Sequence, residues 1–314
     1  MELTIGVDVG GTKIAAGVVD PEGKIVEKVR VETPATTSQA VERGIVAAVR
    51  HVLERHRVAS VGLAVAGFVD EKRSILRFAP NLPMVDRPLR DIVGEAVGLP
   101  VVVENDANAA AWGEYRFGGG RGDDDVVLIT VGTGLGGGVV LHGELLRGAF
   151  GAAGEFGHVR MVPGGLPCGC GNHGCWEQYT SGSALIREAR FLARTRPEAA
   201  VHLLELAGGD PEDITGKMIT SAAREGDATA IGLLADVGRW LGEGIADLAN
   251  VLDPSAVVVG GGVSEAGDLL LEPARQAYST MLSAGAHRPH LRIVAAELGN
   301  DAGLIGAADL ARLR

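Results

Sequence analysis

Hydrophobic positions in the first half of the chain follow two alternating periods. Apolar runs of strand length cover residues 3–9 and 14–19, and further runs typical of buried strands lie at 60–70 and 99–106. Residues 38–56 instead repeat apolar side chains at spacings of three and four, on a face formed by Val41, Ile45, Val46, Val49, Val52 and Leu53. That spacing predicts an amphipathic helix, and the alternation of strands with helices predicts an α/β fold.

The second half of the chain repeats the pattern of the first. Residues 126–131 and 138–141 are again strand-like, and Gly132-Thr133-Gly134-Leu135-Gly136-Gly137 joins them, as Gly10-Gly11-Thr12-Lys13 joins the first pair. Strand, turn rich in Gly and Thr, and second strand recur in the same order. This recurrence predicts a duplicated α/β domain.

The rest of the second half predicts packing elements around a further strand. Residues 181–250 are largely helical in pattern, residues 256–262 form another buried strand, and a helix over 301–313 closes the chain. We expect a small α/β domain over residues 1–115, completed by the C-terminal helix at 301–314. A large α/β domain is expected over residues 116–300, with the glycines at 118–120 marking the junction.

The two glycine-rich turns are candidates for phosphate binding. A turn of this composition presents backbone N–H groups and hydroxyls to an anion; the alternative is a pair of tight hairpins that use Gly for its permitted backbone angles. Gly132–Gly137 also matches the dinucleotide pattern GxGxxG, but that site needs a helix after the loop, and here a strand follows. The protein-kinase signatures HRD and DFG and the Walker A sequence are absent from the sequence.

Asp106 is the candidate acid–base group. It follows an apolar run at the end of a predicted strand, where ligands gather in open α/β sheets, and precedes a predicted helix. A carboxylate there could accept the proton of an attacking hydroxyl, which contributes ~10²–10⁴-fold in rate. The alternative is a helix N-cap, a common role for Asp that is worth ~1 kcal/mol.

A short segment carries all three cysteines and predicts a metal site. Cys168, Cys170 and Cys175, together with His158, supply three thiolates and one imidazole, a set that suits tetrahedral zinc. His173 is a competing fourth ligand, and three reduced buried cysteines are the alternative to any metal. Four protein ligands would make the site closed and structural. The metal would also fix two nearby carboxylates, Glu155 and Glu177.

Charge and composition exclude several classes of function. The formal net charge of −11 without a basic stripe argues against binding to nucleic acid or anionic membranes. The chain opens on an apolar strand rather than a signal-like segment, and no apolar run approaches membrane-spanning length. An odd number of crowded cysteines does not form a disulfide framework. We therefore expect a cytoplasmic protein.

Taken together, these motifs resemble the ROK (repressor, open reading frame, kinase) family, in particular its zinc-containing bacterial glucokinases. The resemblance spans essentially the whole chain, through DVGGTK at 8–13, VENDANAAAWGE at 103–114, VGTGLGGG at 131–138, GEFGHV at 154–159, CGCGNHGCWE at 168–177, VVVGGGV at 257–263 and AGLIGAA at 302–308. It implies a two-domain actin/hexokinase-like (ribonuclease H-like) fold with an interdomain cleft. The implied reaction is ATP-dependent phosphorylation of glucose to glucose 6-phosphate.

The resemblance also implies roles for individual residues. Asp106 would be the general base for the 6-hydroxyl of the sugar. The implied sugar-binding set is Asn81, Asn105, Asp106, Glu155, His158 and Glu177. The implied set for the nucleotide phosphates and Mg²⁺ is Asp8, Gly10, Gly11, Thr12, Lys13, Thr133 and Gly134, with Gly261 and Gly262 in the adenosine pocket. The implied ligands of a structural Zn²⁺ are His158, Cys168, Cys170 and Cys175.

Several alternatives stay open at this point. The acceptor could be another hexose or an N-acetylhexosamine, and the donor could be polyphosphate rather than ATP. The family also includes sugar-responsive repressors, which carry a DNA-binding domain before the sugar domain; Ile5 already lies in the first predicted strand, so we expect none here. The resemblance further implies a homodimer or homotetramer.

Overall fold

The computed structural model describes residues 2–313, and the chain divides into two compact units. The first unit comprises Met1–Leu128, Gly137–Gly154 and Ala296–Arg314, and the second Ile129–Gly136 and Glu155–Ala295. The expected domain ends at residues 1 and 314 lie outside the described residues. The expected boundary at 115/116 stays a prediction, because a compact unit reflects packing and a domain reflects independent folding.

Strands and helices alternate along most of the chain. The strands are β1 (Thr4–Val9), β2 (Lys13–Val19), β3 (Ile25–Glu32), β4 (Val61–Val65), β5 (Phe68–Val69), β6 (Leu76–Phe78), β7 (Val85–Arg87), β8 (Val101–Asn105), β9 (Val126–Val131), β10 (Leu135–Leu141), β11 (Glu144–Leu145), β12 (Ala256–Gly260) and β13 (Arg292–Ala295). The α-helices are α1 (Ser38–Leu53), α2 (Leu89–Val97), α3 (Asp106–Phe117), α4 (Gly182–Thr195), α5 (Val201–Leu206), α6 (Gly216–Arg224), α7 (Ala228–Leu252), α8 (Asp268–Met281) and α9 (Ala302–Arg312). Short 3₁₀ helices are η1 (Phe156–His158), η2 (Trp176–Gln178), η3 (Pro197–Ala199), η4 (Pro211–Asp213), η5 (Gly262–Ala266), η6 (Gly285–His287) and η7 (Gly299–Asp301).

The first unit is built on a five-stranded sheet with the order β3-β2-β1-β4-β8. β1, β2 and β3 pair antiparallel, while β1, β4 and β8 run parallel, so that Asp8 aligns with Ala64 and Ala64 with Glu104. Parallel pairing brings the carboxyl ends of β1, β4 and β8 to one edge of the sheet. The residues that follow these strands are therefore neighbours.

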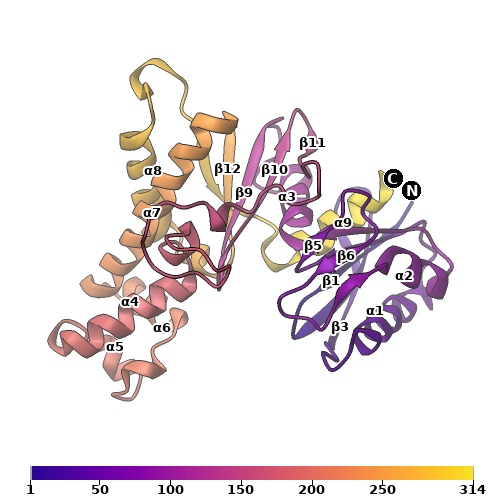
Figure 1. Ribbon diagram of the computed structural model, residues 1–314, viewed down its shortest axis with the longest axis horizontal. Helices are drawn as coiled ribbons and strands as arrows, with labels where there is room; N and C mark the ends of the chain where they lie inside the picture. Colours follow the sequence, from indigo (N-terminus) through magenta and orange to yellow (C-terminus); the bar gives the residue numbers. More distant parts are fainter. Residues whose placement is uncertain (1, 314) are drawn as a thin grey trace. The chain divides into compact units, whose positions relative to one another are not determined.

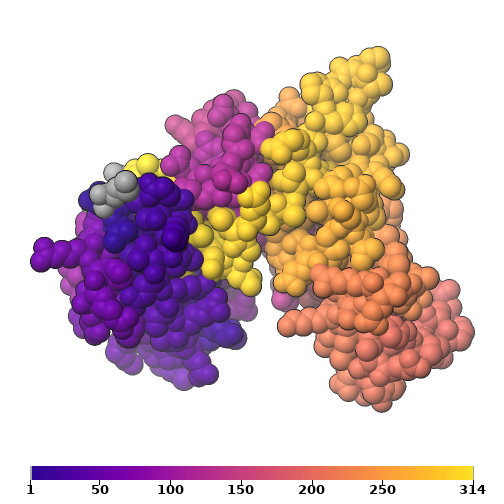
Figure 2. Space-filling model, turned by 180° about the vertical axis from the view of Figure 1, so that it is seen from behind, coloured from indigo at the N-terminus to yellow at the C-terminus, as the bar shows by residue number. Residues whose placement is uncertain are grey.

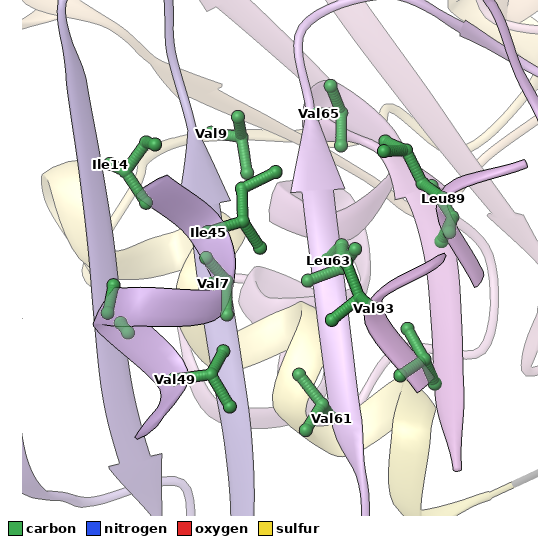
Figure 3. Close-up of a cluster of buried hydrophobic side chains, with 14 of the residues drawn as sticks. Val7, Val9, Ile14, Ile45, Val49, Val61, Leu63, Val65, Leu89 and Val93 are labelled. Carbon is green, nitrogen blue, oxygen red and sulfur yellow. The ribbon is translucent and has the colours of Figure 1, made fainter. Parts of the chain in front are cut away.

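The two faces of this sheet carry side chains of different size. One face presents Val7, Val9 and Leu63 to α1 and α2, in the cluster of buried aliphatic side chains that Figure 3 shows. The opposite face carries Gly6 and Gly62, where an added methyl group would overlap with the backbone of α9. Because successive side chains of a strand point to opposite faces, glycine in alternate positions lets α9 lie directly on the sheet.

The C-terminal helix is part of the first unit despite its distance in sequence. α9 contacts β1, β4 and α3, and the yellow C-terminal residues lie against the indigo N-terminal ones (Figures 1 and 2). Asp8 shares its face of the sheet with Gly6, because the two residues are two positions apart. The close helix packing therefore sets the surroundings of that carboxylate.

The second five-stranded sheet has the order β11-β10-β9-β12-β13, with β12 and β13 parallel. In the second unit, α7 and α8 pack side by side (Figure 1). A methyl group at Gly242 of α7 would overlap with the carbonyl of Ala274 in α8, so glycine permits this close contact. The expected α/β class and the duplication of a glycine-turn hairpin at the start of each sheet are confirmed.

The element boundaries differ from expectation by a few residues. Lys13 and Leu135 already lie in strands, so both glycine-rich turns are shorter than predicted. The helix expected to reach residue 56 ends at Leu53, and the strand expected to reach 262 ends at Gly260. Among residues 2–313, no helix combines the length and apolar character needed to span a bilayer.

The close packing of α9 gives a prediction for stability. Gly62→Ala should lower the free energy of unfolding by ~1–3 kcal/mol. The added methyl group meets backbone of α9 that cannot move aside without displacing the helix. The control is Gly232→Ala in α7, where nothing lies within 4 Å and alanine favours the helix. Urea unfolding measures both variants, and equal effects would contradict the packing argument.

Candidate functional site

Asp106 is the first residue of α3, at the carboxyl edge of the first sheet. Asn105, the last residue of β8, caps the helix: its Oδ1 accepts the backbone N–H of Asn108 at 3.0 Å. Its Nδ2 donates to the carbonyl of Gly67 and to Oδ1 of Asp106, both at 3.1 Å. The alternative that Asp106 is the N-cap is therefore wrong, because Asn105 already holds that position.

A second carboxylate, the half-buried Asp8, lies close enough to Asp106 to be affected by its charge. Burial raises the pKa of Asp8 to about 6, and the negative charge of Asp106 adds to the rise. Lys28 and Arg30 on β3 act in the opposite direction. Two carboxylates that repel one another in a poorly solvated site are stabilised by a cation between them or by a proton.

The pKa of Asp106 is also raised. Burial is the largest cause, and hydrogen bonds from the backbone N–H of Ala107 and from the Asn105 side chain reduce the rise. A carboxyl group whose pKa moves toward neutrality becomes a stronger base when it is ionised. The site therefore provides one carboxylate adapted to proton transfer beside another that favours a cation.

The first glycine-rich turn lies at the same edge of the sheet. The N–H of Gly10 donates to the carbonyl of Lys13 at 3.0 Å, and the hydroxyl of Thr33 donates to the carbonyl of Gly10 at 2.7 Å. A methyl group at Gly11 would stand 3.0 Å from the carbonyl oxygen of Asn81. The turn is thus fixed from two sides. Of the predicted residues in the first unit, Gly11 lies beside Asn81, Asn105 contacts Asp106, and Asp8 lies close enough to Asp106 to be affected by its charge. That Gly10, Thr12 and Lys13 belong to the same site stays a prediction.

In the second unit, four predicted metal ligands converge. The ligand atoms of His158, Cys168, Cys170 and Cys175 all lie within 4.8 Å of one another. Sγ of Cys170 is 3.6 Å from Sγ of Cys175, and Sγ of Cys168 is 3.8 Å from Nδ1 of His158. Zinc–sulfur bonds of ~2.3 Å in a tetrahedron place sulfurs about 3.8 Å apart, so the set fits such an ion. Within residues 2–313, His173 is not part of this cluster.

The two carboxylates expected beside the metal ligands differ in their surroundings. Oε1 of Glu177 lies 3.0 Å from Sγ of Cys168 and 3.8 Å from Nδ1 of His158. Glu155 directly precedes η1, and its carbonyl accepts the N–H of His158 at 3.2 Å. Both glutamates are therefore held next to the ligands, one through its side chain and the other through its backbone.

The second glycine-rich turn adjoins Glu177. A methyl group at Gly134 would stand 2.8 Å from Oε2 of that carboxylate. The carbonyl of Thr133 accepts the hydroxyl of Ser183 at 2.7 Å, which ties the turn to the start of α4. Gly261 has a positive φ of 86° and packs against Val131, whereas nothing lies within 4 Å of a methyl group at Gly262.

Sequence reasoning missed one buried carboxylate next to the candidate base. Glu104 is 4% exposed and lies within ion-pair distance of Arg147 at 2.7 Å and Arg73 at 3.3 Å. Its Oε1 accepts the N–H of Asn105 at 3.2 Å and Nδ2 of Asn108 at 3.3 Å. The available signal was a charged residue directly after three valines of a buried strand.

Comparisons of the sequence and of the structure with known proteins point to the same family. A sequence model of the ROK family matches residues 4–314. The chain is 55% identical over 312 residues to a glucokinase of Streptomyces coelicolor, covering 99% of this chain and 98% of that one. It is 37% identical to an N-acetylmannosamine kinase of Escherichia fergusonii, covering 98% of both. Among solved structures, a ROK family glucokinase from Streptomyces griseus in complex with glucose and AMPPNP matches with a TM-score of 0.89 and 56% identity, over 99% of this chain and 100% of that one.

The raised pKa of Asp8 predicts a pH-dependent effect of its removal. Between the ordinary value of 3.8 and about 6, the folded state binds more protons than the unfolded state. The contribution of Asp8 to stability is therefore highest at low pH and is lost as the pH rises through 6. Asp8→Asn should consequently stabilise the metal-free protein by about 1 kcal/mol more at pH 8 than at pH 5.

Urea unfolding at the two pH values measures this difference. The control is Asp213→Asn, at an exposed position, whose effect should be the same at both. An Asp8→Asn effect that does not change between pH 5 and pH 8 would show that Asp8 titrates as an ordinary carboxylate.

Proposed function

The chain belongs to the ROK family, and we propose that it transfers the γ-phosphate of ATP to the 6-hydroxyl of glucose, giving glucose 6-phosphate. The observation that carries this proposal is the identity of more than half of all residues, over nearly the full length, to glucokinases of Streptomyces. One relative at this level of identity was solved with glucose and AMPPNP, an analogue of ATP.

Asp106 acts as the general base. Asn105 takes the capping role at the start of α3, so the Asp106 carboxylate does not cap the helix, and the hydrogen bond from Asn105 orients it to accept the proton of the sugar hydroxyl. The raised pKa brings it nearer the operating pH, where proton transfer is most effective. Phosphoryl transfer requires positioning and charge stabilisation more than covalent chemistry. One base therefore suffices for the proton transfer, and the other residues of the site position the substrates.

The nucleotide is held by the glycine-rich turns. The first turn supplies the backbone amides of Gly10 and Gly11 with Thr12 and Lys13, and the second supplies Thr133 and Gly134; Gly261 and Gly262 contribute to the adenosine pocket. Asp8 fits a magnesium ligand, because its half-buried carboxylate lies close to Asp106 and a divalent cation relieves their repulsion. Bound with the nucleotide, magnesium would neutralise phosphate charge as it develops.

Glucose is bound by polar side chains. Carboxylate and amide groups accept and donate the hydrogen bonds that sugar hydroxyls need. The proposed set is Asn81, Asn105, Asp106, Glu155, His158 and Glu177. A zinc ion on His158, Cys168, Cys170 and Cys175 would be closed to substrate, and it would fix the backbone that carries Glu155 and Glu177.

Identity to relatives favours glucose over the alternative acceptors. The N-acetylmannosamine kinases match at 37% against 55% for the Streptomyces glucokinases. A ROK family transcriptional regulator also shares the fold, at 27% identity, but the net charge of −11 disfavours nucleic acid as a partner. Assembly as a homodimer or homotetramer, and a place in the cytoplasm where ATP is supplied, belong to the same proposal.

The proposed role of Asp106 as general base predicts the effect of its replacement. Asp106→Asn should reduce kcat by at least ~10²-fold, because the amide keeps the shape of the carboxylate but cannot accept the proton. Glucose binding, measured by isothermal titration calorimetry, should remain detectable. Asp91→Asn, an exposed position on α2, is the matched control and should keep wild-type turnover. Turnover of Asp106→Asn within tenfold of wild type would remove Asp106 from the base role.

Loss of a thiolate gives the second prediction. Cys170→Ser should release zinc and raise the KM for glucose, since Glu155 and Glu177 lose their common anchor. Metal content by mass spectrometry and kinetics measure the two effects. His173→Asn is the control, because His173 lies outside the ligand cluster and its replacement should retain the metal. A metal-free Cys170→Ser protein with normal glucose kinetics would separate the metal from the sugar site.

A further inference from the structure

The first unit has a cavity at the edge of its sheet opposite to Asp106. The cavity measures about 550 Å³ and is lined by the segments that lead into β4 and β8, by the residues before β6, by the start of α2 and by the end of α9; the lining residues are Glu2, Ala59, Ser60, Lys72, Arg73, Arg90, Pro100, Val101, Val102 and Arg312. It therefore lies at the amino ends of the parallel strands, away from the candidate base at their carboxyl ends.

The ionisable groups in this cavity are mainly cationic. Lys72, Arg73, Arg90 and Arg312 line it, and among residues 2–313 Glu2 is the only carboxylate in the lining. This composition is opposite to that of the whole chain, whose formal net charge is −11. A concave site lined by one sign of charge concentrates ions of the other sign, because the protein walls screen the field poorly.

Arg73 shares a carboxylate with a second arginine. Glu104 lies within ion-pair distance of both Arg73 and Arg147. Their side chains are only 21% and 24% exposed, so solvent screens them little. Nη2 of Arg73 is buried without a hydrogen-bond partner. Two cations sharing one anion leave an excess positive charge at the cavity wall.

The pKa of Arg73 agrees with this excess of positive charge. Burial and the nearby charge of Arg147 lower the pKa of Arg73 to about 10, against the opposing effect of Glu104. The guanidinium stays protonated at neutral pH, and an additional anion would stabilise it further.

The other cationic side chains of the cavity differ in the number of contacts that they already make within the protein. Arg312 donates to Asp309, to Oγ1 of Thr4 and to the carbonyls of Val19 and Asp20, so it forms part of the wall. Arg90 and Lys72 are exposed at the rim. Arg90 has only a 3.2 Å contact with the exposed Asp91 and a 3.4 Å contact with the carbonyl of Lys72. These two side chains are free to turn toward a ligand.

We propose that this cavity binds a small phosphate dianion, either inorganic phosphate or the phosphate group of a phosphomonoester, between Lys72, Arg73 and Arg90. Arginine offers the paired N–H donors that match phosphate oxygens, and lysine adds a mobile positive charge. The volume exceeds what inorganic phosphate alone fills, so an organic phosphate also fits.

The cavity is connected to the candidate base through an ion pair and a hydrogen bond. Arg73 contacts Glu104, and Glu104 accepts the backbone N–H of Asn105, the residue that caps the helix starting at Asp106. An anion bound to Arg73 therefore competes with Glu104 for the Arg73 guanidinium. Glu104 in turn accepts a hydrogen bond from the residue before the candidate base. The site goes beyond the proposed reaction, and its existence does not depend on that reaction.

The test is isothermal titration calorimetry of inorganic phosphate into the full chain at constant ionic strength. The wild-type protein should show saturable binding, and Lys72→Ala combined with Arg90→Ala should weaken it at least tenfold. Both residues are exposed, so the variant should fold normally. The control combines Lys24→Ala with Arg43→Ala, which removes two exposed positive charges from the same unit outside the cavity and should leave binding unchanged.

Competition separates the two sources of phosphate. If glucose 6-phosphate displaces inorganic phosphate, and the cavity variant weakens both ligands, the site accepts phosphomonoesters; if only inorganic phosphate depends on the cavity residues, the site is one for the free ion. Absence of saturable phosphate binding would overturn the proposal. Wild-type affinity in the Lys72→Ala, Arg90→Ala variant would also overturn it, since the bound phosphate would then lie elsewhere.

Discussion

The partial burial of two neighbouring carboxylates, Asp8 and Asp106, is the constraint on which the functional edge of the first unit depends. Asp8 lies in β1 and Asp106 begins α3 directly after β8, and parallel pairing of β1, β4 and β8 brings both to one edge of the sheet. Glycines at positions 6 and 62 let α9 close over that face, so water is largely removed from around Asp8. The energy cost appears as raised pKa values at both groups. Such a cost is maintained where a cation or a transferred proton offsets it, as in a phosphoryl-transfer site.

In the second unit, the segment that carries the predicted metal ligands has little regular secondary structure. Between residues 146 and 181 only two 3₁₀ turns, η1 and η2, are present among the described residues. The convergence of His158 with three cysteines gives this segment a point of attachment that a hydrophobic core would otherwise supply. Glu177 touches the ligand cluster on one side and the turn at Gly134 on the other. A metal there would therefore order the Glu177 carboxylate and the turn at Gly134 together.

Much of this was predictable from sequence, for physical reasons that differ between residues. The hairpins followed from apolar runs punctuated by glycine, and the metal site followed from the concentration of thiols in eight residues. His158 was preferred to His173 as the fourth ligand from the sequence, and the ligand cluster agrees with that choice. The capping alternative for Asp106 was wrong, because Asn105 and Asp106 are both good capping residues and only the backbone conformation distinguishes them. Glu104 was missed because its partners, Arg73 and Arg147, lie far away in the sequence and meet it only through folding.

The most direct test of the central claim is the rate of ADP formation with ATP and magnesium across glucose, mannose, fructose, N-acetylglucosamine and N-acetylmannosamine. The account predicts that kcat/KM for glucose exceeds that for each other sugar by tenfold or more, a difference of about 1.4 kcal/mol in transition-state binding. Preference for an N-acetylhexosamine would contradict glucose as the acceptor. Absence of ADP formation with every sugar would contradict ATP as the donor.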